Sequence, residues 1–290
     1  MPWGQLEGIN VAISVLSIIN SLSPKDAGSR KTAHDIAYGS VARQSLDVYA
    51  PSHPPTGQGP LPVVFFIYGG SWNDGSRKQY DFAGRALAAQ GFVTVIADYR
   101  LLPEVEYPGF LHDCALAIRW VVDHIGEHGG DPDRIALMGH SAGAYNAAML
   151  ALDPKLLGAR GALERLRCVV GLSGPYDFFP FDGPITLRTF GAVREPIATQ
   201  PVHFVSASAP PMFLATGEKD TLVYPRNTVA LARRLRAVGV PVTERHYPTL
   251  GHPGTLLALG RPARWIAPVL EEVSTFLHHH LARVPAPLEL

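Results

Sequence analysis

Cysteine is scarce in this chain, with only Cys114 and Cys168 among 290 residues. Two cysteines cannot form a disulfide framework, and neither lies in a CxxC motif or in a Cys/His pattern with metal-ligand spacing. Both have apolar neighbours, so we expect buried, unreactive thiols, although a cross-link between the two stays open. The clustered histidines, His124, His128 and 278–280, lack an acidic partner at metal-site spacing. The sequence therefore predicts neither a metal site nor a cofactor.

An excess of charge of either sign is also missing. The 25 Lys and Arg residues balance 25 Asp and Glu residues, and charged residues make up only 17% of the chain. No basic run is interleaved with aromatic residues, so we expect no nucleic-acid partner. The arginines Arg233, Arg234 and Arg236 have helical spacing and indicate a solvated helix face. Apolar residues make up 47%, enough for one large α/β domain with a sizeable core.

The chain also lacks an apolar run of the length that crosses a bilayer. The best candidate, residues 9–22, is short and is interrupted by Asn and Ser. No Lys or Arg precedes it and no Ala-x-Ala site follows it, which argues against a secretory signal. We predict an apolar N-terminal helix and lead-in over 1–37, docked on a domain that spans 38–290. This interpretation implies no integral membrane span and a cytoplasmic protein, whereas a truncated signal would place it in the periplasm or outside the cell.

What the chain does contain is an alternation of short β-branched and aromatic runs with helical patterns. Such alternation requires crossover connections, so it predicts a mostly parallel central sheet flanked by helices. No repeat of fixed period and no low-complexity linker divides the chain. The predicted strands are 46–49, 61–68, 92–98, 134–138, 168–172, 212–215 and 242–247, and the predicted helices are 82–89, 112–125, one after Ser141, 228–238 and 269–280.

One segment, 174–209, breaks this alternation. It holds five phenylalanines and several prolines, and its hydrophobic periodicity is weak. An aromatic insertion of this length between core strands predicts a small cap over a pocket. The alternative is an irregular helix and loop that simply covers the sheet.

The sequence Gly-His-Ser-Ala-Gly at 139–143 follows a predicted strand and precedes an Ala-rich helical pattern. A GxSxG motif in this context predicts a nucleophile elbow, a tight turn that lifts a serine hydroxyl to the carboxyl edge of the sheet. The helix that follows directs its N-terminal N–H groups toward the same point. Ser141 is therefore the candidate nucleophile.

A serine hydroxyl needs a base to take its proton, and in this fold the acid and the histidine follow the serine in that order. Asp220 lies on a turn after the strand 212–215, and His252 follows the strand 242–247 through a short loop. Both would reach the sheet edge that carries Ser141. The alternatives weighed for these two places are Glu218 and Asp177 for the acid, and His246 and His203 for the base. We expect His140, next to the nucleophile, to point away from the pocket.

The developing oxyanion requires preorganised N–H donors. One candidate is the backbone N–H of Ala142, directly after the nucleophile. The loop Tyr-Gly-Gly-Ser-Trp at 68–72 follows the strand 61–68 and offers the N–H groups of Gly70 and Ser71. Glycine here allows the backbone to approach a substrate closely. The alternative is an ordinary glycine turn.

Taken together, these motifs resemble the α/β-hydrolase carboxylesterases of the hormone-sensitive-lipase-like branch and of the bacterial feruloyl-esterase and arylformamidase-like branch. The resemblance runs from about residue 38 to about residue 276. The matching stretches are Tyr-Gly at 38–39, Leu-Asp-Val-Tyr at 46–49, Tyr-Gly-Gly-Ser-Trp at 68–72, Asp-Tyr-Arg-Leu-Leu-Pro-Glu at 98–104, Gly-His-Ser-Ala-Gly at 139–143, Gly-Glu-Lys-Asp at 217–220 and Gly-His at 251–252.

The resemblance implies an α/β-hydrolase fold with Ser141, Asp220 and His252 as nucleophile, acid and base. It also implies oxyanion donors at Gly70, Ser71 and Ala142, and a structural role for the segment 98–104. Two positions depart from the family pattern. Tyr68 stands where the family usually has His, which affects how the loop is braced, and Ser71 replaces a common Gly.

We therefore expect a serine hydrolase that cleaves short-chain or aryl carboxylic esters, small-molecule substrates, through an acyl-enzyme on Ser141. Trp72 and three phenylalanines of the cap segment, Phe178, Phe181 and Phe190, are candidates for an apolar substrate pocket, or else plain core aromatics. Two alternatives are an arylformamidase or other amidase with the same triad, and a binding protein of this fold without catalysis. The sequence leaves a homodimer open.

Overall fold

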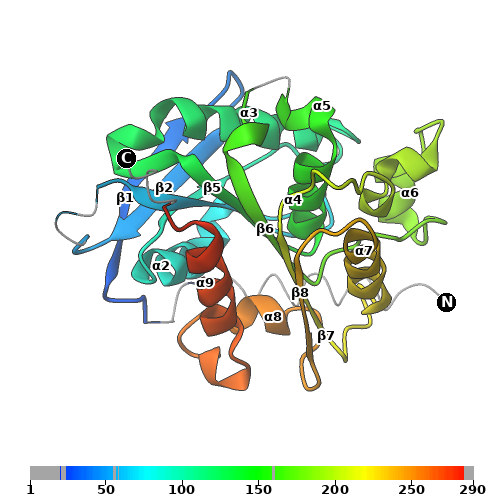
Figure 1. Ribbon diagram of the computed structural model, residues 1–290. Helices are drawn as coiled ribbons and strands as arrows, with labels where there is room; N and C mark the ends of the chain where they lie inside the picture. The colour runs from blue at the N-terminus through cyan, green and yellow to red at the C-terminus, as the bar shows by residue number, and fades with distance from the viewer. Residues whose placement is uncertain (1–19, 21–23, 55–56, 58, 159–160, 284–290) are drawn as a thin grey trace, which may run out of the picture.

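The computed structural model describes residue 20 and the ranges 24–54, 57, 59–158 and 161–283. Within them a single sheet of eight strands runs through the molecule in the order β1-β2-β4-β3-β5-β6-β7-β8 (Figure 1). The strands are β1 (Ser29–Ala37), β2 (Ser45–Pro51), β3 (Leu61–Ile67), β4 (Val93–Ala97), β5 (Gly130–His140), β6 (Leu166–Leu172), β7 (Met212–Gly217) and β8 (Val242–Tyr247).

The sheet is mostly parallel, as the alternation of strands and helices predicts. β1 and β2 are joined to the rest by antiparallel pairing, whereas β4, β3, β5, β6, β7 and β8 pair in parallel. The inner parallel strand β3 is a continuous apolar run because helices cover both faces of the sheet. Every residue of β4 is buried. The carboxyl ends of these strands meet along one edge, where the candidate site residues lie.

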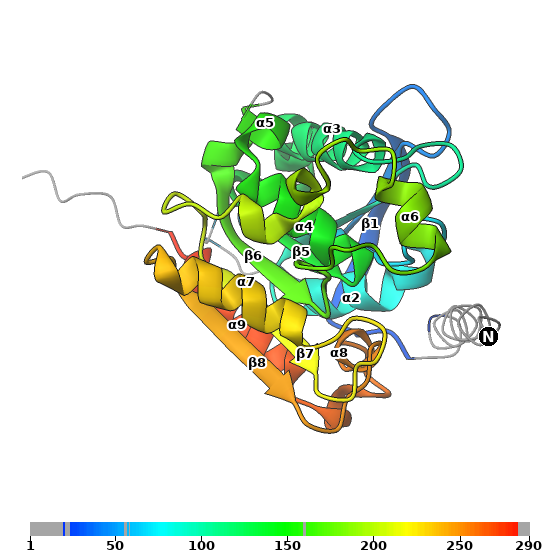
Figure 2. The same ribbon diagram turned by 90° about the vertical axis from the view of Figure 1, so that its right-hand side faces the viewer.

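Helices cover both faces of the sheet (Figures 1 and 2). Contacts between helices link α3, α4 and α5 on one side, and α2 and α9 on the other. The bounds are α2 (Asp81–Ala89), α3 (Gly109–His124), α4 (Ala142–Leu152), α5 (Pro154–Leu157), α6 (Pro184–Phe190), α7 (Arg226–Ala237), α8 (Gly254–Leu257) and α9 (Val269–His280). Short 3₁₀ helices occupy Arg77–Tyr80, Ile125–His128, Leu163–Arg165, Pro196–Thr199, Pro201–His203 and Arg264–Ile266.

The strand β1 is an element that the sequence analysis did not predict. It is polar, its burial follows no strict alternation, and its pairing with β2 contains register irregularities. An exposed edge strand of this kind has no apolar face to reveal it in a sequence. The sheet therefore includes residues that we had assigned to the lead-in over 1–37. All of 9–22 except Asn20 lies outside the described residues, so the predicted apolar helix and the cytoplasmic location stay predictions.

The segment 174–209 adds no strand to the sheet and contains only α6 and two 3₁₀ helices. It is fastened to the rest of the molecule by two tyrosines. The Tyr145 hydroxyl donates to the carbonyl of Thr199 at 2.7 Å, and the Tyr107 hydroxyl donates to the carbonyl of Ala198 at 3.1 Å. The segment thus lies against α4, the helix that follows Ser141.

Cys114 and Cys168 are both buried and free, so no cross-link joins them. Burial raises the pKa of both thiols, which keeps them protonated and unreactive. Among the described residues, no group of three His, Cys, Asp or Glu side chains is arranged to hold a metal ion. Across the same residues, no helix has both the length and the apolar character that crossing a bilayer requires.

Candidate active site

Ser141 lies at the sharp turn between β5 and α4 and adopts φ 55° and ψ −125°. A residue with a side chain is strained in this region. The turn is possible because its flanking glycines allow close packing. A Cβ on Gly139 would lie 2.2 Å from the carbonyl oxygen of Gly143, and a Cβ on Gly143 would lie 2.0 Å from the carbonyl oxygen of Ile67. This is the geometry expected of a nucleophile elbow.

Asp220 and His252 come to Ser141 from the loops after β7 and β8. His252 Nε2 lies 2.8 Å from Ser141 Oγ, and His252 Nδ1 lies 2.8 Å from Asp220 Oδ2. The other carboxylate oxygen, Asp220 Oδ1, accepts the backbone N–H groups of Leu222 at 3.0 Å and Val223 at 2.8 Å. Both oxygens of the carboxylate are hydrogen-bonded, and the Asp220 side chain is completely buried. The three predicted side chains thus form one hydrogen-bonded chain.

The hydrogen bonds of this chain fix its protons. An ionised carboxylate can only accept a hydrogen bond. His252 Nδ1 therefore carries the proton and donates it to Asp220 Oδ2. In the neutral imidazole, Nε2 is then an acceptor, and the Ser141 hydroxyl donates a hydrogen bond to it. Ser141 is 7% exposed, so the hydroxyl is nearly screened from solvent. The arrangement can move a proton from the serine to the imidazole.

The alternative residues do not reach this site. Glu218 is hydrogen-bonded to His246 Nδ1, and His246 Nε2 binds Glu244 at 2.9 Å. Asp177 and His203 are exposed to solvent.

The loop after β3 has three successive residues with positive φ. Gly70 has φ 124°, Ser71 has φ 52° and Trp72 has φ 59°. Glycine is required at position 70, where a Cβ would lie 2.1 Å from the carbonyl oxygen of Asp74. No hydrogen bond within the described part of the chain takes up the N–H of Gly70 or of Ser71.

The third predicted donor, the N–H of Ala142, belongs to the first residue of α4. The first N–H groups of a helix have no partner within it, and the positive end of the helix dipole lies there. Among the residues that the structure describes, none takes up the N–H of Gly70, Ser71 or Ala142. These donors belong to the loop after β3 and to the start of α4, directly after Ser141.

Comparisons with known proteins bear on this site. The family model named BD-FAE matches residues 46–235. The chain belongs to this family. It is 33% identical over 230 residues to "Carboxylesterase NlhH" of Mycobacterium tuberculosis (strain CDC 1551 / Oshkosh), covering 72% of each chain. It is also 32% identical to "Probable carboxylic ester hydrolase LipM" of M. tuberculosis (strain ATCC 25618 / H37Rv), covering 89% of this chain and 65% of LipM.

Among solved structures, a thermostable esterase from Pseudomonas putida ECU1011 superposes with a TM-score of 0.73 at 26% identity, covering 95% of this chain and 91% of that one. The predicted α/β-hydrolase fold is thereby confirmed. The chain spans slightly less than two thirds of the first curated relatives that it matches, 65% of LipM and 64% of the esterase LipC.

In this BD-FAE family member, Tyr68 is held by a network that the sequence analysis missed. The Tyr68 hydroxyl donates to Asp98 Oδ1 at 2.9 Å and accepts from Arg43 Nη2 at 3.1 Å. Its ring stacks on Tyr80 and on Tyr99, with centroids 5.3 and 4.8 Å apart. Arg43 also donates to the carbonyl of Gly75, at the far end of the same loop. Tyr68 and Arg43 therefore brace both ends of the loop that carries Gly70 and Ser71.

The four predicted pocket residues gather in one aromatic cluster. The Trp72 ring lies 4.9 Å from that of Phe190 and 6.3 Å from that of Phe178, and the Phe181 ring lies 5.5 Å from Phe190. Trp72 and Phe190 are almost completely buried, whereas Phe178 and Phe181 are half-buried. Tyr145 of α4, which the sequence analysis did not single out, completes the cluster at 5.2 Å from Trp72.

His140 also differs from expectation. We expected its side chain to point away from the pocket, but its ring packs beside the ring of His252, with the centroids 5.0 Å apart.

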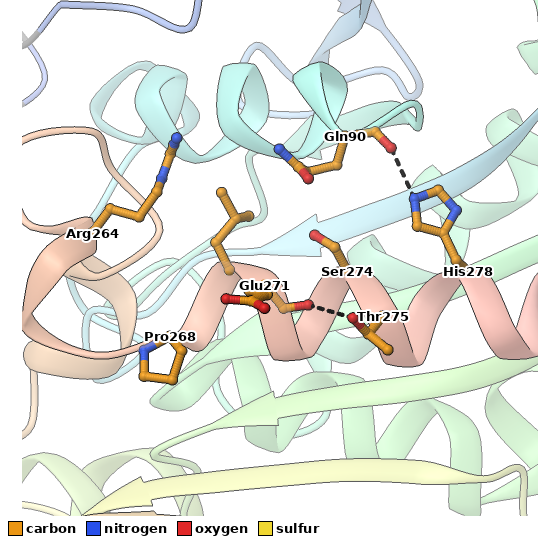
Figure 3. A pocket seen from close by; sticks show the side chains of 8 residues that line it. Gln90, Arg264, Pro268, Glu271, Ser274, Thr275 and His278 are labelled. Atoms are coloured by element: carbon orange, nitrogen blue, oxygen red, sulfur yellow. Dashed lines mark hydrogen bonds between the residues drawn. The ribbon is translucent and has the colours of Figure 1, made fainter.

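A separate hollow of about 360 Å³ lies between the end of α2 and α9, on the other face of the sheet (Figure 3). Its lining includes Gln90, Arg264 and His278 and none of the candidate site residues.

Proposed function

We propose that this chain is a serine esterase that cleaves carboxylic esters through an acyl-enzyme on Ser141. The observation that carries the proposal is the hydrogen-bonded chain from Ser141 through His252 to the buried Asp220, with both distances at 2.8 Å. A nucleophile, a base within hydrogen-bond reach and a third group that orients the base are the parts that nucleophilic catalysis requires.

In the proposed mechanism, His252 Nε2 takes the proton of Ser141 as Oγ attacks the ester carbonyl. Asp220 holds the imidazole in the required tautomer and stabilises its charge. His252 then gives its proton to the leaving alcohol as the ester C–O bond breaks. Water next attacks the acyl-enzyme, with His252 again as base, and the acid product leaves with the enzyme restored.

The backbone N–H groups of Gly70, Ser71 and Ala142 are the proposed oxyanion donors. Removal of one donor of this kind from a hydrolase costs about 3 kcal/mol of transition-state stabilisation. The positive φ of Ser71 supports the assignment, because such strain in a residue with a side chain persists only where the surroundings hold it. The hydrogen bonds of Arg43 to the Tyr68 hydroxyl and to the Gly75 carbonyl hold the two ends of this loop in place.

The names of the relatives agree with this chemistry, since NlhH is called a carboxylesterase and LipM a probable carboxylic ester hydrolase. We propose short-chain or aryl esters as the substrate class. Phe178 and Phe181 are half-buried and so keep apolar surface that a small acyl or aryl group can cover. Trp72 and Phe190 are too enclosed for direct contact, so we assign them to the wall behind that surface.

The test is hydrolysis of p-nitrophenyl acetate, butyrate and octanoate, with N-formylkynurenine alongside, by the wild type and by Ser141→Ala. We expect the fastest turnover on the shorter esters and none by Ser141→Ala. Ser206→Ala changes an exposed serine that only pairs with Ser208 and serves as the matched control. Reaction with diethyl p-nitrophenyl phosphate, followed by peptide mapping, should place the phosphoryl group on Ser141. Faster turnover of the formamide than of every ester would contradict the esterase assignment, and undiminished activity in Ser141→Ala would contradict the nucleophile.

A further inference from the structure

His140 is the last residue of β5 and directly precedes the proposed nucleophile. Its side chain is buried, and its Nε2 lies 3.0 Å from the backbone carbonyl oxygen of His252. Because a carbonyl oxygen can only accept, His140 Nε2 carries the proton and donates it. A residue next to the nucleophile is thus bonded to the backbone of the proposed base.

The His140 ring stays uncharged in this position. Burial and the neighbouring His252 lower the pKa of His140 to about 3, against smaller opposing effects of its bond to His252 and of Asp220. The ring is therefore neutral when His252 becomes an imidazolium during the reaction, and no second positive charge faces it. Gly69, in the loop after β3, lies close to the ring, since a Cβ there would lie 3.4 Å from His140 Nδ1.

The sheet topology explains why such a bond is useful. Ser141 follows β5 near the centre of the sheet, whereas His252 follows β8, the edge strand. The order β5-β6-β7-β8 separates them by three inter-strand steps, which amounts to about 14 Å. The base must therefore reach back over the ends of β6 and β7 on a loop. The bond from His140 ties that loop directly to the strand that carries the nucleophile.

We propose that His140 is a positioning residue, whose Nε2–H fixes the backbone of His252 so that its imidazole meets Ser141 at hydrogen-bond distance. This inference rests on the proposed function, because it assigns a role within the same site. A displacement of about 1 Å in a catalytic group can cost roughly 100-fold in rate. Loss of the bond should therefore lower kcat and leave substrate binding almost unchanged.

The experiment compares His140→Gln with His140→Asn. The side-chain amide of Gln reaches about as far as the imidazole Nε2, whereas that of Asn is shorter and reaches only as far as Nδ1. The chain supplies a matched control in His278, whose Nε2 makes the same kind of bond, 3.0 Å long, to the carbonyl of Gln90 far from the site (Figure 3). Because His278 is exposed, the pair His278→Gln and His278→Asn controls for the two substitutions themselves at a place outside the site.

We expect His140→Asn to lower kcat on p-nitrophenyl acetate about 10- to 100-fold with KM within about twofold of wild type. His140→Gln should keep kcat within about threefold, and both His278 variants should match the wild type. A low-field proton NMR resonance, from His252 Nδ1–H on Asp220, should persist in His140→Gln and broaden or vanish in His140→Asn.

Equal kcat values in the Gln and Asn variants of His140 would overturn the proposal, whether both match the wild type or both are slowed alike. A rise in KM with unchanged kcat would also overturn it. If the wild type shows no Ser141-dependent turnover at all, the proposed function fails instead. The NMR comparison still decides the His140 contact in that case, since it needs no substrate.

Discussion

The hydrogen bond between Trp72 and Asn146 offers a quantitative test of how the loop at 69–75 is held. Trp72 Nε1 donates to Asn146 Oδ1 at 3.0 Å, and Asn146 is completely buried on α4. Trp72 itself has φ 59°, directly after Ser71 with φ 52°. Each such residue costs about 1–3 kcal/mol of strain that its surroundings must hold. We expect the hydrogen bond from Trp72 to Asn146 to be one of the contacts that hold Ser71 and Trp72 in this strained conformation.

The size of the effect follows from burial. Trp72→Phe leaves Asn146 Oδ1 without its donor in a dry site, which costs about 1–3 kcal/mol, and the smaller ring costs about 1 kcal/mol more in packing. Asn146→Leu keeps the branching and the number of heavy atoms but leaves the indole N–H unpaired, again at about 1–3 kcal/mol. The double variant removes donor and acceptor together, so its cost should fall short of the sum by about 1–2 kcal/mol.

The assay is guanidinium chloride unfolding of the wild type, the two single variants and the double variant, with kcat and KM for p-nitrophenyl acetate measured on each. Since Ser71 shares its peptide bond with Trp72, release of the loop should lower kcat at least about 10-fold in either single variant and change KM little. Single-variant costs that add within about 0.5 kcal/mol would refute the coupling. Variants that are destabilised but fully active would show that the bond stabilises the core without shaping the site.

Two further predictions follow from other hydrogen bonds. Asp220→Asn places an amide N–H opposite His252 and so favours the tautomer whose Nε2 is already protonated; kcat should fall about 10⁴-fold, and a loss smaller than about tenfold would contradict the assigned role of the acid. The partial burial of His246 disfavours its charged form and lowers its pKa. The hydrogen bonds of His246 to Glu244 and Glu218 favour the charged form more strongly, so the pKa is raised overall. A raised pKa stabilises the fold below the unfolded value of about 6.5, and this contribution is lost as the pH rises through the folded pKa. The unfolding free energy of wild type minus that of His246→Gln should thus be larger at pH 5.5 than at pH 8.5, and a pH-independent difference would contradict it.

The features of the fold that the sequence predicts are those with local causes. Buried parallel strands are apolar runs whatever surrounds them, so β3 and β4 stand out in the sequence. The elbow at Ser141 depends on Gly139 and Gly143 within the same five residues. Asp220 and His252 can be predicted because each follows a strand whose carboxyl end must lie at the edge that carries Ser141.

The features that the sequence analysis missed depend on contacts between distant segments. The strand β1 is polar on an open edge, and only its pairing with β2 defines it. Arg43 braces the loop after β3 from a separate loop before β2, and no pattern around Arg43 indicates that contact. The bond from His140 to His252 joins residues 112 positions apart. We expected His140 to point away from the pocket because it directly precedes Ser141. That expectation takes no account of the loop that carries His252, which lies against His140.

These missed contacts share one consequence for the chemistry. Trp72 follows the proposed oxyanion donors, bonds to Asn146 on the nucleophile helix and packs against Phe190 of the cap segment. The loop of the proposed oxyanion donors, the helix after Ser141 and the cap segment are thus joined through one buried side chain. Because protein interiors are packed closely and transmit strain, a change at the cap reaches the oxyanion loop through Trp72. We therefore expect the proposed acyl-binding surface and the proposed oxyanion donors to be coupled, so that substitutions at Phe190 alter both the preference for acyl length and kcat.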